Sequence, residues 1–120
     1  MTARDRRAAE RSGIAAERAA AWLLALKGYR LLERRYRSPA GEIDLIAARG
    51  RRLAFVEVKR RASGADAAWS VLPRQQQRIA RAAGHWLARR PAYAGHDIGF
   101  DVVLVAPWSI PRHLRDAFRV

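Results

Sequence analysis

The stretch from Gly41 to Arg61 constrains the fold of this chain more than any other, because its pattern is that of a β-hairpin. Two runs, GEIDLIAAR and RLAFVEVKRR, alternate apolar and polar residues for much of their length, which is typical of half-buried strands. Between them, Gly50 and Arg51 match the Gly-X signature of a two-residue type II′ turn. We therefore expect two paired strands with Gly50 and Arg51 at the turn.

This hairpin places four charged side chains on one face of the sheet, because side chains alternate between faces along a strand. In the register set by the turn, Asp44 lies across from Glu57, and Glu42 lies across from Lys59. The opposite face is apolar and is predicted to face a core; its members are Ile43, Leu45, Ala54, Val56 and Val58.

The opposed carboxylates of Asp44 and Glu57 allow two interpretations. At about 5 Å they repel each other by roughly 3 kcal/mol at an effective dielectric of about 20. A hard cation such as Mg²⁺ would turn this repulsion into a binding site, since it takes oxygen ligands. Alternatively, Lys59 and Arg60 neutralise the two acids on a solvated surface. The hairpin alone leaves both open.

A helix before the hairpin carries a third acid. Ser12 is a suitable N-cap for a helix from Gly13 to Lys27. Residues 1–11 are predicted to form a disordered basic arm, and residues 12–120 are predicted to form one domain. Glu17 falls on the apolar stripe of this helix, where a carboxylate needs a partner or a metal. The other interpretation pairs Glu17 with Arg18 or Arg34.

The remaining chain adds strands and a second helix. We predict strands at residues 29–37 and 98–106, and a helix from Pro73 to about Arg90 with Gln75 at the start of its inward face. The tail is expected to hold a short helix over residues 112–118. Residues 62–70 are predicted to be a mobile loop, and Trp69 in it is interpreted as a packing residue or a base-stacking residue.

Charge indicates the partner. The formal net charge is +13, and 22 of the 24 basic residues are Arg, whose planar fork suits phosphate. Nucleic acid is the expected partner, ahead of an anionic membrane surface. The basic residues predicted to contact it are Arg37, Arg60, Arg61, Arg74 and Arg78.

Several function classes are disfavoured. The chain has no Cys, and its three His show no metal-ligand spacing, so thiolate and His-based metal sites are not expected. No apolar run is long enough for a membrane span, and no export signal is recognised, so we expect a cytoplasmic protein with no membrane partner and no small-molecule cofactor.

The order helix, three strands, helix, strand, with Asp44 followed by Glu57-Val58-Lys59, resembles the PD-(D/E)xK nuclease superfamily. More closely, the chain resembles the YraN family of small endonuclease-like proteins, on GEIDLI followed by FVEVK, with Gly13, Glu17 and Phe100-Asp101-Val102-Val103. The resemblance implies an α/β restriction-endonuclease-like fold in three layers, order αβββαβ, with a mixed sheet flanked by helices.

The resemblance also implies site roles. Asp44, Glu57, the carbonyl of Val58 and Glu17 would hold Mg²⁺ or Mn²⁺, and Lys59 would orient water and stabilise charge on the phosphate. Two positions depart from the family pattern: Gln75 stands where Lys is usual, and Arg34 or Arg35 where Asn is usual. Gln75 is kept as a site residue.

The implied function is a metal-dependent endonuclease or phosphodiesterase acting on DNA, with branched or processed DNA as one candidate substrate. Two alternatives remain: a nucleic-acid-binding protein that keeps the nuclease fold without catalysis, and a basic interaction subunit of a nucleoprotein complex. A homodimer is also left open.

Overall fold

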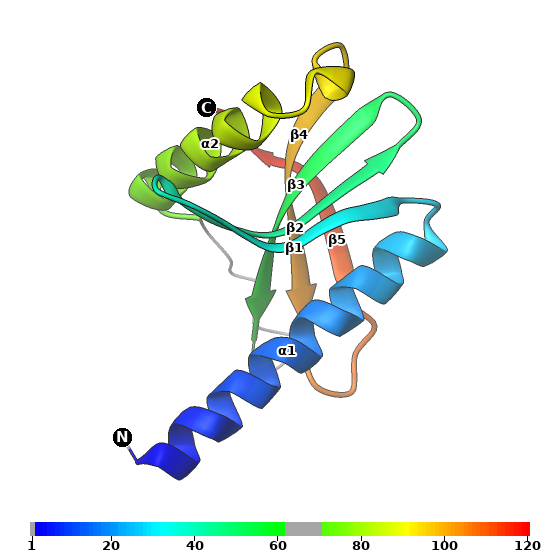
Figure 1. Cartoon of the computed structure of the whole chain (residues 1–120). Coiled ribbons are helices and arrows are strands. Elements are labelled where there is room, and N and C mark those ends of the chain that lie inside the picture. Colours follow the sequence, from blue (N-terminus) through cyan, green and yellow to red (C-terminus); the bar gives the residue numbers. More distant parts are fainter. Residues whose placement is uncertain (1, 62–70) are drawn as a thin grey trace.

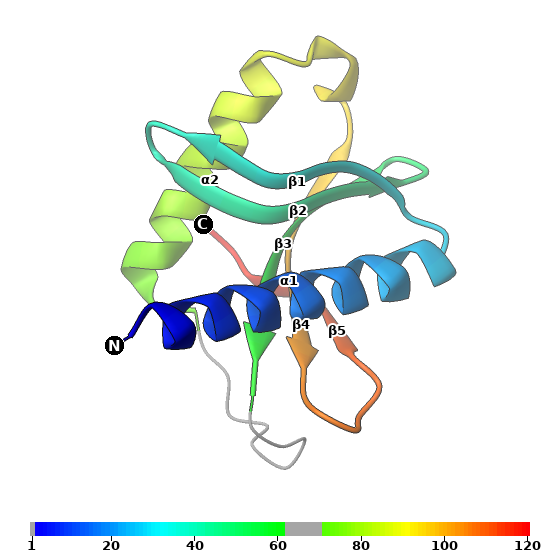
Figure 2. The same ribbon diagram turned by 60° about the horizontal axis from the view of Figure 1, so that its bottom comes forward.

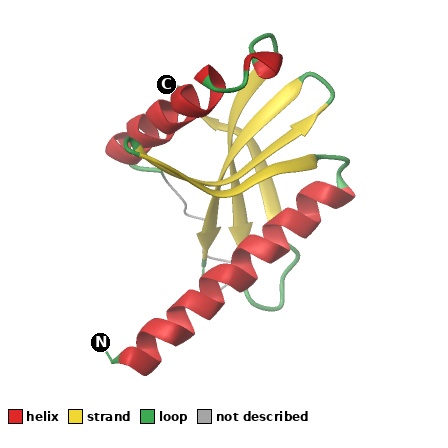
Figure 3. Cartoon of the chain, in the orientation of Figure 1, coloured by secondary structure: helices red, strands yellow, loops and turns green. Residues whose placement is uncertain are grey.

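The computed structural model describes residues 2–61 and 71–120 of the chain. The predictions for the 62–70 loop and for Trp69 lie outside these residues. The chain forms a helix, three strands, a second helix, a short 3-10 turn and two further strands (Figures 1 and 3). The elements are α1 (Ala3–Leu26), β1 (Arg30–Ser38), β2 (Gly41–Arg49), β3 (Arg52–Arg60), α2 (Pro73–Ala88), η1 (Pro91–Tyr93), β4 (Asp97–Val105) and β5 (Arg112–Phe118).

The strands form one mixed sheet in the order β1-β2-β3-β4-β5. β3 and β4 run parallel, and the other neighbouring pairs are antiparallel. α1 crosses one face of the sheet and α2 covers the other, as Figure 2 shows. The protein therefore has the predicted restriction-endonuclease-like α/β fold in three layers.

Each face of the sheet has its own apolar core. On the α2 side, Phe55 and Trp86 meet edge to face with their ring centroids 6.0 Å apart. On the α1 side, the small side chains of Ala20 and Ala21 let the helix approach Val56 and Val103 closely. Burial of these apolar faces is the main force that holds the layers together.

The β2–β3 hairpin has the predicted register. Paired residues run from Arg49–Arg52 to Leu45–Val56, and Gly50 and Arg51 form the turn. Gly50 has φ +57°, a left-handed conformation that glycine adopts without steric cost. The ladder ends one residue before the expected Asp44–Glu57 pair, and this end is where the candidate site begins.

The N-terminal prediction was wrong. α1 begins at Ala3, so residues 3–11 are helical instead of a disordered arm, and Thr2 instead of Ser12 is the N-cap. The Thr2 hydroxyl accepts a hydrogen bond from the Asp5 backbone N–H, and the Asp5 carboxylate accepts from the Thr2 backbone N–H. This capping box satisfies free N–H groups at the helix start and extends the helix by nearly three turns.

The C-terminal prediction was also wrong. Residues 112–118 form strand β5, paired antiparallel to β4, instead of a helix, so the sheet gains a fifth strand. Contacts made far along the chain explain the difference, since His113 and Asp116 both bind the buried Asp101 of β4. Phe118 returns to the core as predicted. Within the described residues, neither helix is long and apolar enough to cross a bilayer.

Candidate functional site

The candidate site lies where β2 separates from β3. Ile43 packs in the α2-side core, yet Leu45, two residues later, packs in the α1-side core. A regular strand would point both side chains to the same face, so β2 departs from strict alternation around Asp44. The predicted apolar face that included both residues is corrected accordingly.

The Asp44 side chain replaces a lost backbone contact at this point. Beyond the last ladder pair, Leu45–Val56, the Asp44 carboxylate accepts a hydrogen bond of 2.8 Å from the backbone N–H of Val58. This bond fixes the carboxylate beside β3 and next to Glu57, whose side chain follows the buried Val56 on the strand. The structure therefore brings the two predicted carboxylates together.

Gln75 and Lys59 complete the site from the α2 side. The side-chain amide of Gln75 donates to the Glu57 carboxylate at 2.9 Å, and its carbonyl oxygen accepts from the Lys59 ammonium at 3.2 Å. Lys59 lies 3.6 Å from Glu57, and both side chains are largely buried. The first turn of α2, which begins at Pro73, thus positions two groups on β3.

The pKa values of Asp44 and Glu57 are both raised. Burial, then the nearby charge of Asp44, raises the pKa of Glu57 to about 7, with Lys59 opposing the rise only in part. Burial also raises the pKa of Asp44, against the lowering effect of the Val58 N–H. A hydrogen bond between the two carboxyls favours the proton on Glu57. Near neutral pH the pair therefore carries less than its full charge and would gain from a cation.

Glu17 approaches the pair without joining it. Its carboxylate accepts a hydrogen bond of 2.8 Å from Arg35, although its charge is close enough to raise the pKa of Asp44 further. No group of three or more acidic or His side chains able to hold a metal occurs in residues 2–61 and 71–120. The role of Glu17 as a metal ligand thus stays a prediction, and its ion-pair partner is neither Arg18 nor Arg34.

Arg35 itself has an unusual backbone, with φ +48°. This left-handed region is unfavourable for Arg and several-fold enriched in Asn. Of the two positions, Arg34 and Arg35, where the family resemblance leads one to expect Asn, only Arg35 has this backbone conformation.

The donor set suits a hard divalent cation. Two adjacent carboxylates supply oxygen ligands, and the pKa of Glu57, raised first by burial and then by the charge of Asp44, would be lowered by a bound cation. Neither soft sulfur nor imidazole groups accompany them among the described residues. Asp44, Glu57 and the carbonyl of Val58 therefore fit Mg²⁺ or Mn²⁺ better than Zn²⁺.

The predicted phosphate-binding arginines have different surroundings. Arg37 forms an exposed ion pair of 2.8 Å with Glu42, so Glu42 turns to β1 instead of facing Lys59. Gly41 packs on α2, where an added Cβ would lie 3.3 Å from the Cβ of Arg78, so the β1–β2 turn sits beside that arginine. Arg60 and Arg74 are exposed, and Arg61 follows the end of β3.

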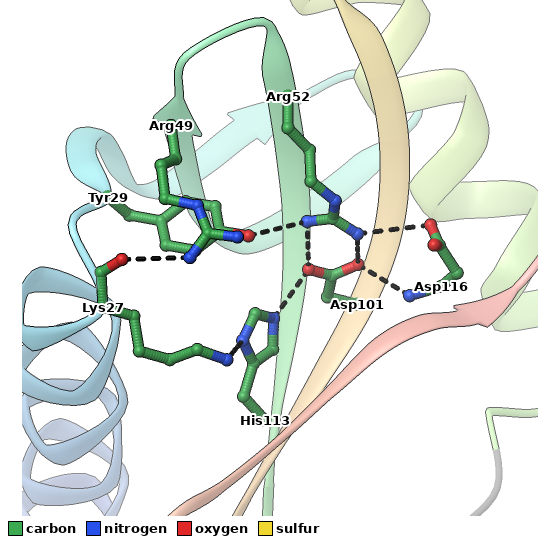
Figure 4. A network of polar contacts seen from close by, with 7 residues as sticks. All are labelled: Lys27, Tyr29, Arg49, Arg52, Asp101, His113 and Asp116. Carbon is green, nitrogen blue, oxygen red and sulfur yellow. Dashed lines mark hydrogen bonds and ion pairs between the residues drawn. The ribbon is translucent and has the colours of Figure 1, made fainter.

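A second polar cluster lies between β3, β4 and β5 (Figure 4). Asp101 is fully buried and forms a two-pronged ion pair with Arg52, each bond 2.7 Å long. It also accepts hydrogen bonds from His113 at 2.7 Å and from the Asp116 backbone N–H at 3.0 Å. Burial alone would raise the pKa of Asp101, but these donors lower it to about 2.

Tyr29, Arg49 and Lys27 extend the cluster around Asp101, and the sequence alone did not identify them. Tyr29 lies beside Arg52, its hydroxyl accepting at 3.1 Å, and the guanidinium of Arg49 lies 4.7 Å from the Tyr29 ring centre. Lys27 contacts His113 from the end of α1 (Figure 4). Every bond here joins residues more than ten positions apart, so no local pattern could have revealed the cluster.

Comparison with known proteins gives one consistent result. Residues 16–105 match the model of "Uncharacterised protein family UPF0102". A UPF0102 protein of Bradyrhizobium diazoefficiens is 58% identical over 115 residues, which is 95% of this chain and 86% of the relative. A UPF0102 protein of Rhodopseudomonas palustris is 59% identical over 95% of this chain and 84% of its own length. A UPF0102 protein of Parvibaculum lavamentivorans is 57% identical over 93% of this chain and 84% of its own length.

Proposed function

The chain belongs to the UPF0102 family, and we propose that it is a metal-dependent phosphodiesterase that acts on DNA. The observation that carries the proposal is the largely buried pair of Asp44 and Glu57 with Lys59 beside it. Buried carboxylates that repel each other, with an adjacent ammonium, cost stability, and a structural role gives no reason to keep them.

Asp44, Glu57 and the Val58 carbonyl would hold the cation, with Glu17 as a further ligand when it leaves Arg35. A bound Mg²⁺ would activate a water molecule and neutralise charge on the scissile phosphate. The chain's own contribution is to hold the carboxylates fixed. The Val58 N–H fixes Asp44, and the Gln75 amide fixes Glu57.

Lys59 would act on the phosphate directly. Its ammonium is held by the Gln75 carbonyl and the Glu57 carboxylate, so it needs little reorganisation to stabilise developing negative charge. It also has donors left to orient a water molecule toward the phosphorus. Lys59 is thus the residue whose removal tests catalysis most directly.

The charge favours a nucleic acid as substrate, and the resemblance to endonuclease-like proteins favours DNA. Around the site, Arg60 and Arg61 extend β3, and Arg74 and Arg78 lie on the exposed side of α2. Together with the net charge of +13, these residues provide a surface that attracts a polyanion without reading base sequence.

One observation favours a second candidate, a nucleic-acid-binding protein without catalysis. Glu17 is engaged by Arg35, and the described residues contain no complete three-acid site. If two carboxylates are too few to hold the cation in the complex, the fold and its basic surface would remain while cleavage would be lost.

The decisive experiment compares cleavage of single-stranded, duplex, flap and four-way-junction DNA with Mg²⁺ or Mn²⁺. We expect metal-dependent cleavage by the wild-type protein, none by Lys59→Ala or Asp44→Asn, and wild-type cleavage by Asp97→Asn, which alters an exposed carboxylate away from the site. Tight binding of all substrates with no cleavage by any variant would instead establish the binding protein.

A further inference from the structure

The outer face of α1 carries a row of arginines that ends at a tryptophan. Arg4, Arg7, Arg11, Arg18 and Trp22 fall within an arc of about 60° on the helix, given about 100° per residue. They span about 27 Å along the helix axis at 1.5 Å per residue. Ala16, Ala20 and Leu24 are buried on the opposite side of α1, and the buried Ala21 lies at the edge of the row beside Trp22.

This row is open to solvent. The four arginines are exposed, and the Trp22 side chain keeps 70% of its surface accessible. Glu10 and Glu17 lie to one side of the row, about 90–110° around the helix from its centre. In the described part of the chain no carboxylate forms an ion pair with any of the four arginines. The row therefore has uncompensated positive charge beside an exposed aromatic ring.

A groove between α1 and β1 connects the row to the candidate site. Its first part, about 470 Å³, is lined by Trp22, Ala25 and Leu31, with Arg18 and Arg34 at its polar side. A second hollow of about 240 Å³ shares Arg18 and Arg34 and continues to Glu17 and Arg35. Since the charge of Glu17 reaches Asp44, the groove ends near the carboxyl pair.

We propose that this groove binds an unpaired nucleic-acid strand, with a base stacked on Trp22 and the neighbouring phosphates on Arg18 and Arg34. The inference rests on the proposed function and narrows its substrate to DNA with a single-stranded segment. The apolar wall formed by Ala25 and Leu31 suits a base, and the paired arginines suit its phosphates.

The aromatic ring distinguishes an unpaired strand from a duplex. Within a duplex each base face is covered by its neighbours, so Trp22 could reach only the backbone. An unstacked base offers its π-face, and such stacking contributes about 1–3 kcal/mol for each base. The arginines of the row would then bind the continuing backbone as far as Arg4.

The test measures binding of labelled oligo(dT) and of a blunt duplex by fluorescence anisotropy in EDTA, which prevents cleavage. Trp22→Ala should weaken oligo(dT) binding roughly 5- to 100-fold and leave duplex binding within about twofold. Trp22→Phe, which keeps a ring, should restore most of the affinity. The matched control is Trp108→Ala, because Trp108 is fully exposed in the β4–β5 connection.

Equal affinity of wild type and Trp22→Ala for oligo(dT) would overturn the inference, as would an equal loss in Trp108→Ala. The inference would also be overturned if Trp22→Ala weakened binding to vesicles of anionic lipid and left oligo(dT) binding unchanged. Cleavage tested with Asp44→Asn reports on the proposed activity separately. If the protein cleaves DNA but its oligo(dT) binding does not depend on Trp22, the groove proposal alone is refuted. If oligo(dT) binding depends on Trp22 but no DNA is cleaved, the proposed catalysis alone is refuted.

Discussion

The side-chain amide of Gln75 donates a hydrogen bond of 2.9 Å to the carboxylate of Glu57, which ties the start of α2 to β3. Because Gln75 also holds Lys59, removing it should release both groups. We expect Gln75→Ala to lower Mg²⁺ affinity or the cleavage rate about 10- to 100-fold, the usual cost of losing a residue that positions metal ligands. Calorimetric titration of Mg²⁺ and single-turnover cleavage would measure this.

Gln77→Ala is the matched control, since Gln77 is exposed on the same helix. Gln75→Lys gives a second comparison, because a cation beside Glu57 should lower the pKa of that carboxyl. If Gln75→Ala matched the wild type in both measurements, the bridge between α2 and β3 would have no part in the site.

The raised pKa of Glu57 predicts an unusual pH dependence of stability in the absence of divalent ions. The folded pKa is about 7 and the unfolded value is 4.5, so between these values the folded state binds more protons. The contribution of Glu57 to stability is therefore fully present below about pH 4.5 and is lost as pH rises through 7, by about 3 kcal/mol. Urea unfolding in EDTA at several pH values would show the loss.

Glu57→Gln should remove most of this dependence, because a Gln cannot ionise and only the smaller contribution of Asp44, whose pKa is also raised by burial, would remain. Glu42→Gln is the control, since Glu42 lies exposed on the same hairpin. The free energy of unfolding would be measured from about pH 5 to about pH 8, which spans the predicted transition. If it changed with pH equally in the wild type and in Glu57→Gln, the burial assigned to the carboxyl pair would be contradicted.

The hairpin shows what local sequence can and cannot predict about this site. The Gly50–Arg51 turn and the alternation beyond it predicted the β2–β3 register, because both are local properties of the chain. The same alternation could not show that β2 leaves the ladder at Asp44. That departure depends on tertiary packing, because Ile43 packs in the core beneath α2 and Leu45 packs in the core beneath α1.

The errors at the two ends have a similar origin. At the start of α1 a local signal existed, the capping box of Thr2 and Asp5, but the dense arginines around it were interpreted as disorder. At residues 112–118 no local signal would have sufficed. Asp116 has φ +51°, and its backbone N–H binds Asp101, so the strand is selected by contacts with β4.

The buried Asp101–Arg52 pair predicts a large loss of stability on removal of its charge. Asp101→Asn should destabilise the fold by about 3–5 kcal/mol, because Arg52 would lose its fully buried counter-charge and keep only the more exposed carboxylate of Asp116, 3.2 Å away. Asp97→Asn, an exposed change on the same strand, should have little effect. Chemical unfolding at neutral pH measures both, and equal stabilities would show that the cluster contributes nothing net.

The same pair should also make the stability of the protein depend on pH in acid. The pKa of Asp101 is about 2 in the folded state against 3.8 unfolded, so its contribution is present above about pH 4 and is lost as pH falls toward 2. A thermal unfolding series over this range should show a steeper decline in the wild type than in Asp101→Asn. Equal slopes would mean that Asp101 does not govern acid unfolding.

Arg35 holds Glu17 and does so from a left-handed backbone, which makes it a testable point of control over the metal site. Arg35→Asn should keep or raise the melting temperature, because Asn adopts φ +48° more readily than Arg. It should also raise Mg²⁺ affinity severalfold, since Glu17 becomes available beside Asp44. Arg35→Gln separates the two effects, because it frees Glu17 without easing the backbone. Adding Glu17→Gln to Arg35→Asn should remove the gain in affinity, and unchanged Mg²⁺ binding in Arg35→Asn would show that Glu17 is not a ligand.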